Sequence, residues 1–301
     1  FVECGDSARD MTGCFRERTA RAALVVPFDF QRTIRRGGTA PVQVIVDAAD
    51  PNAAQLVRNY VGRVIADFNE GRGGAASAGF ESRAAAPFDT RTAVLFNPNL
   101  ESSYFFVPGI VAMIMVMICA LLTSLTIARE KETGTMEQIL VSPVRPREII
   151  IGKVLPYVLL AFLDGLVVLL LGILLFDIPF RGDIGLMTVL STVYLLTALS
   201  LGLMISTRAR SQQVAIMLAL TATLLPTLML SGLMFPIDSM PRALQLFTRL
   251  VPARYFLLII RGIMLKGSGI MHLWREAAPL AAMTVVLLVL SVRRFNARLE
   301  G

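Results

Sequence analysis

Five long apolar stretches lie in the last two-thirds of the chain. The first, residues 104–128, contains 25 residues without a charge, and a helix of that length extends about 37 Å. A helix of about 20 apolar residues crosses the hydrocarbon layer of a bilayer. The pattern therefore predicts a polytopic α-helical membrane protein. The other four predicted spans cover residues 154–176, 186–205, 214–230 and 277–292.

Residues 1–100 show short apolar runs that alternate with helix-forming segments. Residues 22–26 and 42–46 predict two buried strands with a short helix between them, at residues 28–36. Because a helix joins the two strands, we expect them to be parallel. The sequence thus predicts a small α/β domain at 1–100, followed by a transmembrane domain at 101–301.

A longer helix is predicted to follow the second strand. Asp50 suits its N-cap and Pro51 its first turn, and the helix should run to about residue 68, before a flexible glycine-rich stretch at 71–79. The apolar positions that fall at helical spacing are Leu56, Tyr60, Val61, Val64, Ile65 and Phe68.

Composition and charge narrow the class of protein. Hydrophobic residues make up 55% of the chain and charged residues 17%, against roughly a quarter in soluble domains, which excludes a disordered or collagen-like chain. The net charge is +7, but no run of five basic residues exists. Lys and Arg concentrate in the cytoplasmic loops of membrane proteins, so we expect a bilayer and no nucleic acid as the partner.

The distribution of Lys and Arg predicts the topology. The basic residues are densest in the loops after the first and third spans and in the tail after the fifth, which favours these segments as cytoplasmic. We therefore expect residues 1–100 to be extracytoplasmic, the C-terminus to be cytoplasmic, and the membrane to be the bacterial inner membrane. An extracytoplasmic domain at 1–100 requires an earlier membrane span, so we expect a helix before Phe1 and six spans in the full protein.

Cysteine and histidine restrict the candidate chemistry. Cys119 lies inside an apolar run and is expected to be buried, whereas Cys4 and Cys14 belong to the polar region. Their spacing leaves open whether they form a disulfide in an oxidising compartment. With His272 as the sole histidine, a multi-histidine metal site cannot form, and no cofactor is expected on this chain.

A charged segment at residues 129–147 follows the first span. Gly134 permits a turn, Thr135 and Gln138 fit a capping box, and Pro143 ends the short helix that the pattern predicts. The segment is either a solvated loop or a docking element for a cytoplasmic partner, since a short helix with apolar side chains on one side can bind in a groove of a partner protein.

The run REKETGTMEQILVSPVR at residues 129–145, with Gly152 and Lys153 after it, resembles the coupling-helix signature of permeases from type 2 ABC exporters. The runs SGLMFP at 231–236 and VPARYF at 251–256 resemble the same family's outer segment, and residues 25–47 resemble its extracytoplasmic domain. The resemblance covers nearly the whole chain. It implies a re-entrant outer segment at 231–276.

The resemblance also implies partners. ATP and Mg would reside on a separate ATPase subunit, and this chain would not be an enzyme; its nearest P-loop spacing, Gly262 to Gly267, is followed by Ser268 instead of Lys. A second permease, identical or paralogous, would complete the membrane part, and a periplasmic adaptor would dock on the outer domain. The residues implied to contact the ATPase are Arg129, Glu130, Glu132, Gly134, Thr135, Met136 and Glu137.

The spans hold two candidates for a translocation path. Asp164 is a carboxylate in the second span, and it either bonds a hydroxyl or carbonyl of a neighbouring span or lines a path for cationic compounds. Met113 and Met117, with Met115 between them, either form an adaptable substrate surface or pack against lipid and protein.

Three functions compete. The first is the permease of an exporter for amphipathic small molecules, drug-like or lipid-like. The second is a non-transporting scaffold that transmits ATPase motion to an extracytoplasmic partner. The third, an intramembrane enzyme, lacks support because the spans show no paired Ser/Lys or His/Asp groups.

Overall fold

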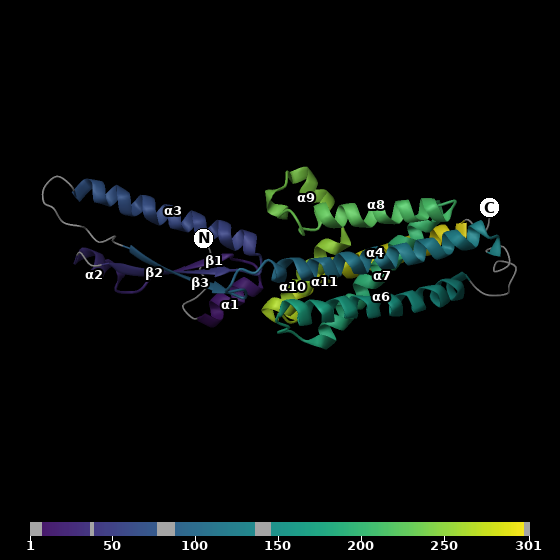
Figure 1. Ribbon diagram of the computed structural model, residues 1–301, viewed down its shortest axis with the longest axis horizontal. Helices are drawn as coiled ribbons and strands as arrows, with labels where there is room; N and C mark the ends of the chain where they lie inside the picture. The colour runs from purple at the N-terminus through teal and green to yellow at the C-terminus, as the bar shows by residue number, and fades with distance from the viewer. Residues whose placement is uncertain (1–7, 37–38, 77–87, 136–145, 298–301) are drawn as a thin grey trace. The chain divides into compact units, whose positions relative to one another are not determined.

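A computed structural model of the chain describes residues 8–36, 39–76, 88–135 and 146–297. The chain divides into two compact units, Phe1–Phe105 and Phe106–Gly301. In Figure 1 the first unit runs from purple to blue, and the second from blue through green to yellow.

The first unit contains a three-stranded sheet with β2 in the centre. Strand β1 pairs with β2 in the antiparallel sense, and β2 pairs with β3 in the parallel sense. Helix α3 packs over one face of this sheet (Figure 1). The elements are α1 (Ala8–Arg16), β1 (Ala22–Val25), α2 (Phe30–Arg35), β2 (Ala40–Asp47), α3 (Pro51–Ala76) and β3 (Phe88–Leu95).

The expected parallel pairing of the first two strands is wrong. Ala22 lies opposite Val46 and Val25 opposite Gln43, so β1 and β2 are antiparallel. The connecting helix α2 has six residues and rises about 9 Å, whereas a return along the eight residues of β2 needs about 26 Å. The crossover is made instead by the 26-residue α3, which leads to the parallel strand β3 that the sequence analysis missed.

Helix α3 begins where the sequence predicts. The Asp50 side chain accepts hydrogen bonds from the backbone N–H groups of Asn52 and Ala53, at 3.0 and 3.2 Å. The helix continues to Ala76, so the first part of the predicted flexible stretch is helical, and residues 77–79 lie outside the described residues. A glycine inside a helix costs about 1 kcal/mol relative to alanine but does not forbid the helix.

The buried face of α3 differs in part from the predicted one. Val57 and Val61 pack against a core formed by Val44, Val46, Ala48 and Ala54. The predicted positions Leu56, Tyr60 and Val64 are instead 58%, 60% and 65% exposed. These three residues, called here the α3 row, recur every fourth residue, so helical spacing alone did not distinguish them from the stripe that faces the sheet.

The second unit is helical, and all five predicted spans are confirmed as helices. Five helices in the described chain are long and apolar enough to cross a membrane, which makes this a multi-pass membrane protein. The elements are α4 (Ser103–Glu132), α6 (Pro146–Phe176), α7 (Ile184–Arg208), α8 (Gln212–Leu230), the 3-10 turn η1 (Ile237–Ser239), α9 (Arg242–Thr248), α10 (Pro252–Lys266) and α11 (Ile270–Ala297).

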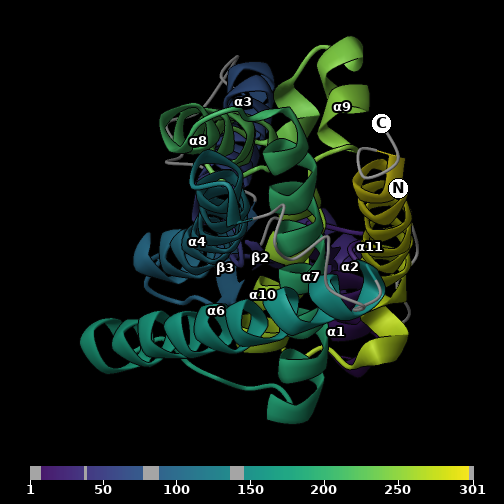
Figure 2. The same ribbon diagram turned by 90° about the vertical axis from the view of Figure 1, so that its right-hand side faces the viewer.

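Helix α7 stands between α4 and α11 in the view of Figure 2. Among the five spanning helices, α4 and α7 are the most buried, each with half of its apolar window buried. Tyr194 on α7 is fully buried and its ring stacks on Phe256 of α10, with the centroids 4.1 Å apart. Gly202 lets α4 approach closely, because a Cβ at this position would lie 2.7 Å from the Ala120 carbonyl oxygen.

Hydrogen bonds join α7 to two neighbouring helices. The hydroxyls of Thr197 and Thr284 of α11 lie 2.6 Å apart, and Ser291 of α11 donates to the Ser200 carbonyl at 2.9 Å. The Tyr194 hydroxyl donates to the Ala112 carbonyl of α4 at 2.8 Å. Bonds of this kind stabilise helix association in lipid by roughly 1 kcal/mol each.

The segment between α8 and α11 is irregular, as the sequence suggests. Helices α9 and α10 are bent by 78° at a short break, a geometry of a broken span or a re-entrant loop. Gly267 ends α10 with a φ of 60°, and α11 begins at Ile270. Residues 270–276, the last part of the outer segment predicted at 231–276, belong to α11, because its polar first turns continue the helix beyond the apolar part. The outer location of 231–276 stays a prediction.

Candidate functional site

The charged end of α4 is attached to the turn between α7 and α8. The Lys131 ammonium donates a hydrogen bond to the Ser206 carbonyl in the last turns of α7. The Glu132 carboxylate accepts one from the backbone N–H of Gln212, the first residue of α8, at 3.0 Å. An anion at a helix N-terminus is favoured by the helix dipole. We call this attachment the α4 joint.

Small side chains allow the joint to close. Ala128 of α4, Ala209 between α7 and α8, and Ala215 of α8 form a buried cluster beneath the two polar contacts. Ala209 ends α7, and Ser211 caps α8 by accepting from the Val214 N–H at 3.4 Å. Since each residue of the cluster has only a methyl group, the helix ends approach closely, and a shift of α4 displaces the turn.

The chain turns away from α4 directly after the joint. Gly134 has a φ of 72°, a left-handed conformation that glycine adopts without strain. The Thr133 N–H donates to the Arg129 carbonyl at 2.9 Å, and the Thr135 hydroxyl lies 3.3 Å from the Glu130 carbonyl oxygen. These contacts hold residues 133–135 against the end of α4.

The predicted ATPase-contact residues fall into two groups. Arg129, Glu132, Gly134 and Thr135 are exposed at the end of α4, and Glu130 is half-buried beside them. Met136, Glu137 and most of the predicted coupling helix at 129–147 lie outside the described residues. The described part thus forms one charged, exposed surface that adjoins the joint.

Asp164 lies on α6, and its Oδ2 is buried without a hydrogen-bond partner among the described residues. Cys119 of α4 is free and fully buried, as expected from the sequence. The described chain brings no hydroxyl or carbonyl to that oxygen. A role for Asp164 in a translocation path stays a prediction.

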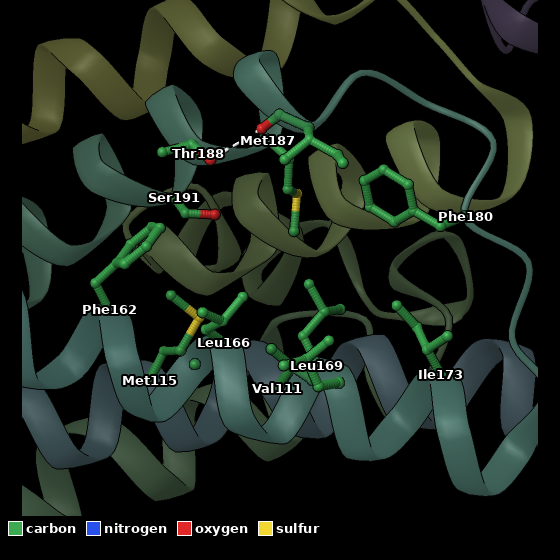
Figure 3. Close-up of a pocket in the computed structure, with 13 residues that line it drawn as sticks. Val111, Met115, Phe162, Leu166, Leu169, Ile173, Phe180, Met187, Thr188 and Ser191 are labelled. Carbon is green, nitrogen blue, oxygen red and sulfur yellow. Dashed lines mark hydrogen bonds between the residues drawn. The ribbon is translucent and has the colours of Figure 1, made fainter.

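A cavity of about 170 Å³ lies between α4, α6 and α7 (Figure 3). Met115 is buried and lines it, whereas Met113 and Met117 are half-buried and do not. Asp164 is not among the lining residues either. The principal lining side chains are Met115, Phe162, Leu166, Leu169, Phe180 and Met187.

Most of the cavity residues were missed by the sequence analysis. Those on α6 lie at the spacing of a single helix face and are Phe162, Gly165, Leu166, Leu169, Leu170 and Ile173. Leucine at such spacing is common in every span, so the one signal in the sequence was the pair Gly165 and Gly172, seven residues apart.

Two further site predictions concern cysteine and metal. Cys14 is disulfide-bonded, Cys119 is free, and Cys4 lies outside the described residues. Within the described ranges, no group of three or more His, Cys, Asp or Glu side chains is arranged to hold a metal ion.

Comparison with known proteins gives consistent matches over nearly the whole chain. The family model described as "ABC-2 family transporter protein" matches residues 4–293. The chain is 35% identical to the probable multidrug ABC transporter permease YbhS of Escherichia coli K12 over 296 residues, which are 98% of this chain and 78% of that protein. It is 33% identical to the probable multidrug ABC transporter permease YbhR over 272 residues, 88% of this chain and 71% of that one. ABC transporter G family member 20 of Dictyostelium discoideum is 30% identical over 213 residues, which are 70% of this chain and 29% of that protein.

Proposed function

Since the chain belongs to the ABC-2 transporter family, we propose that it is the membrane-spanning permease subunit of an ATP-driven exporter that moves amphipathic small molecules, drug-like or lipid-like, out of the cytoplasm. Its relatives YbhS and YbhR carry names of probable multidrug ABC transporter permeases, which supports both the permease role and the substrate class. The resemblance noted in the sequence is confirmed at the level of the family. ATP and Mg would be held by a separate ATPase subunit, and this chain would supply no catalytic group.

The α4 joint is the observation that carries the proposal. The ATPase subunit would contact the seven residues that the sequence predicts, namely Arg129, Glu130, Glu132, Gly134, Thr135, Met136 and Glu137. Because Lys131 and Glu132 bond to the ends of α7 and α8, a push on this surface would move three helices together. Rigid transmission of this kind converts partner closure into rearrangement of the membrane helices.

The proposed orientation follows the distribution of basic residues. The joint, the 136–145 segment and the C-terminus would face the cytoplasm across the bacterial inner membrane, and residues 1–100 would be extracytoplasmic. The working unit would contain two permeases, identical or paralogous, and two ATPase subunits.

The test is stimulation of ATP hydrolysis. The full chain and its ATPase subunit are reconstituted in lipid, and wild type is compared with Glu132→Arg and Gly134→Pro. Glu132→Arg places a cation at the positive N-terminus of α8, and proline removes the left-handed turn at 134. Both variants should lose complex formation or stimulated hydrolysis, whereas Glu17→Arg, an exposed acidic residue in the first unit, should behave as wild type. Normal assembly and hydrolysis in both joint variants would refute the proposed contact.

A second candidate function is a scaffold that transmits ATPase motion to an extracytoplasmic partner such as a periplasmic adaptor. The exposed α3 row, Leu56, Tyr60 and Val64, supports it, because an apolar row at four-residue spacing suits a partner helix. In the same reconstitution, ATPase stimulation without movement of any amphipathic dye would favour the scaffold. Loss of adaptor crosslinking in Tyr60→Glu, but not in Asn59→Glu, would assign the row to that partner.

A further inference from the structure

Helix α6 approaches α4 closely beside the cavity that lies between α4, α6 and α7. A Cβ at Gly165 would lie 2.8 Å from the Met115 sulfur, and one at Gly172 would lie 2.7 Å from Val107 Cγ1. Both separations are shorter than a real Cβ tolerates, so a side chain at either position would displace Met115 or Val107, and the two glycines permit this close approach. The adjacent face of α6 is then left with open space toward α7, as Figure 3 shows.

The side chains that line the cavity are apolar and favour an apolar ligand. None of the side chains that line the cavity is charged. Two hydroxyls are present, and that of Thr188 donates to the Ile184 carbonyl of its own helix at 2.9 Å. A cavity of about 170 Å³ that offers so few polar partners does not hold water well, and an engineered apolar cavity of about 150 Å³ binds benzene. A headgroup or an ammonium would lose its hydration here without compensation.

The cavity opens toward the hydrocarbon layer. Leu166 and Leu170 line it and are also 41% and 47% exposed, so they form its rim. The residues deeper inside, Met115 and Met187, are 3% and 6% exposed. A molecule that comes from the bilayer therefore reaches these two methionines past an apolar rim, formed by Leu166 and Leu170 of α6 and by Ile184 of α7, which is 71% exposed.

We propose that this cavity binds one hydrocarbon group taken laterally from the bilayer, either a segment of an acyl chain or a single ring. The volume accepts a group of about the size of benzene, well below the roughly 300 Å³ of a pocket that encloses a whole drug-sized molecule. The rest of the ligand would remain in the membrane beyond Leu166 and Leu170. The site is separate from the α4 joint, and a hydrocarbon group can occupy it when no ATPase subunit is bound.

The test is photolabelling of the full chain in phosphatidylcholine nanodiscs without ATPase. One probe is a phosphatidylcholine that carries a diazirine within an acyl chain, and the other is a phenyl diazirine that partitions into the bilayer. Label is located by mass spectrometry at Met115 and Met187, which lie inside the cavity, and at Leu174, which is 75% exposed on α6 and reports general access from lipid.

Matched variants separate the cavity from the surface of α6. Leu169→Trp fills the cavity, and Leu171→Trp adds the same bulk to an exposed position of the same helix that does not line it. Label at the two methionines should fall roughly tenfold in Leu169→Trp, which corresponds to about 1.4 kcal/mol of lost binding, and should be unchanged in Leu171→Trp. Ser191→Leu fills the cavity from α7 and should act as Leu169→Trp does, so a folding defect in one variant is recognised by the other.

The two probes distinguish the sources of the hydrocarbon group. Label from the phospholipid probe alone identifies an acyl chain of the bilayer, and label from the phenyl probe alone identifies a dissolved ring compound; either result supports the site. Label at Leu174 without label at Met115 and Met187 overturns it, and this is also the result expected if another protein segment covers the rim. Equal label in Leu169→Trp and Leu171→Trp overturns it as well.

Discussion

The contact between α4 and α7 at Gly202 predicts a measurable loss of stability when one methyl group is added. In Gly202→Ala the new Cβ would lie 2.7 Å from the Ala120 carbonyl oxygen and 2.9 Å from Thr123 Cβ. The first of these atoms belongs to the backbone, so a rotamer change cannot relieve the clash and the two helices must separate. Overpacking of this kind costs about 1–3 kcal/mol.

Gly152→Ala is the matched control. Gly152 is also inside a helix, and a Cβ there meets nothing within 4 Å. Both substitutions gain about 1 kcal/mol of helix propensity, so this gain cancels and the difference between the variants isolates the packing cost of about 1–3 kcal/mol. At about 2–4 °C per kcal/mol for a unit of this size, the two unfolding midpoints should differ by roughly 2–12 °C.

The assay uses Cys119, which is free, fully buried, and adjacent in sequence to Ala120. With Cys4 and Cys14 replaced by serine, a maleimide dye reacts with Cys119 only as the helices unpack during heating. Gly202→Ala should react at a lower temperature than Gly152→Ala. Coincident curves for the two variants would refute the close α4–α7 contact, and with it the account of how the α4 joint moves α7.

Three further perturbations test single bonds. Tyr194→Phe removes the hydroxyl that bonds the Ala112 carbonyl, and should cost about 0.5–1.5 kcal/mol in the same thiol assay; no change would mean that the bond is absent in lipid. Thr197→Val and Thr284→Val, alone and combined, should show a coupling energy of about 0.6 kcal/mol, and strict additivity would contradict the 2.6 Å contact. Asp50→Ala removes the cap of α3 and should cost about 1 kcal/mol, seen as faster hydrogen exchange in the first turn of that helix.

The spans were predictable because an apolar run of about 20 residues is stable in a bilayer almost only as a helix, which satisfies its own backbone hydrogen bonds. The limits of these helices were less predictable, since a helix continues past the bilayer wherever its polar residues still favour helix. The last span illustrates this: the apolar run begins near residue 277, but α11 begins at Ile270 and includes His272 and Glu276. Hydropathy locates the membrane part of a helix and leaves its ends undetermined.

The sheet was less predictable because strand pairing depends on contacts far apart in the sequence. Strand β3 carries Asp89 and Arg91 among its apolar residues, so its run is too polar to be identified as a buried strand from the chain alone. It pairs with β2 from Ala40 opposite Phe88 to Asp47 opposite Leu95. Once β3 is missed, the short helix α2 is taken for the crossover, and the parallel pairing of β1 and β2 follows as an error.

The candidate sites show the same division. The turn at Gly134 could be predicted from the local sequence, and Gly134 has the left-handed backbone of such a turn. The charged residues around it are exposed or half-buried at the end of α4. The cavity does not follow from local sequence, because it depends on which face of α6 meets α4. Met115 and Met113 are equivalent in the sequence, yet only Met115 lies on the cavity side of α4.

The α4 joint and the cavity are linked by two shared helices. Met115 of α4 lines the cavity and Lys131 forms part of the joint, 16 residues or about 24 Å away on one continuous helix. Helix α7 likewise supplies Met187 to the cavity and the Ser206 carbonyl to the joint.

A hydrocarbon group that favours one arrangement of these helices would change the affinity of the permease for the ATPase subunit. By thermodynamic linkage, ATPase binding would change the affinity for the hydrocarbon group by the same factor. Leu169→Trp should then change the affinity of the permease for its ATPase although the substitution lies far from the contact surface, whereas Leu171→Trp should not. Equal affinity for both variants would show that the two sites are energetically independent.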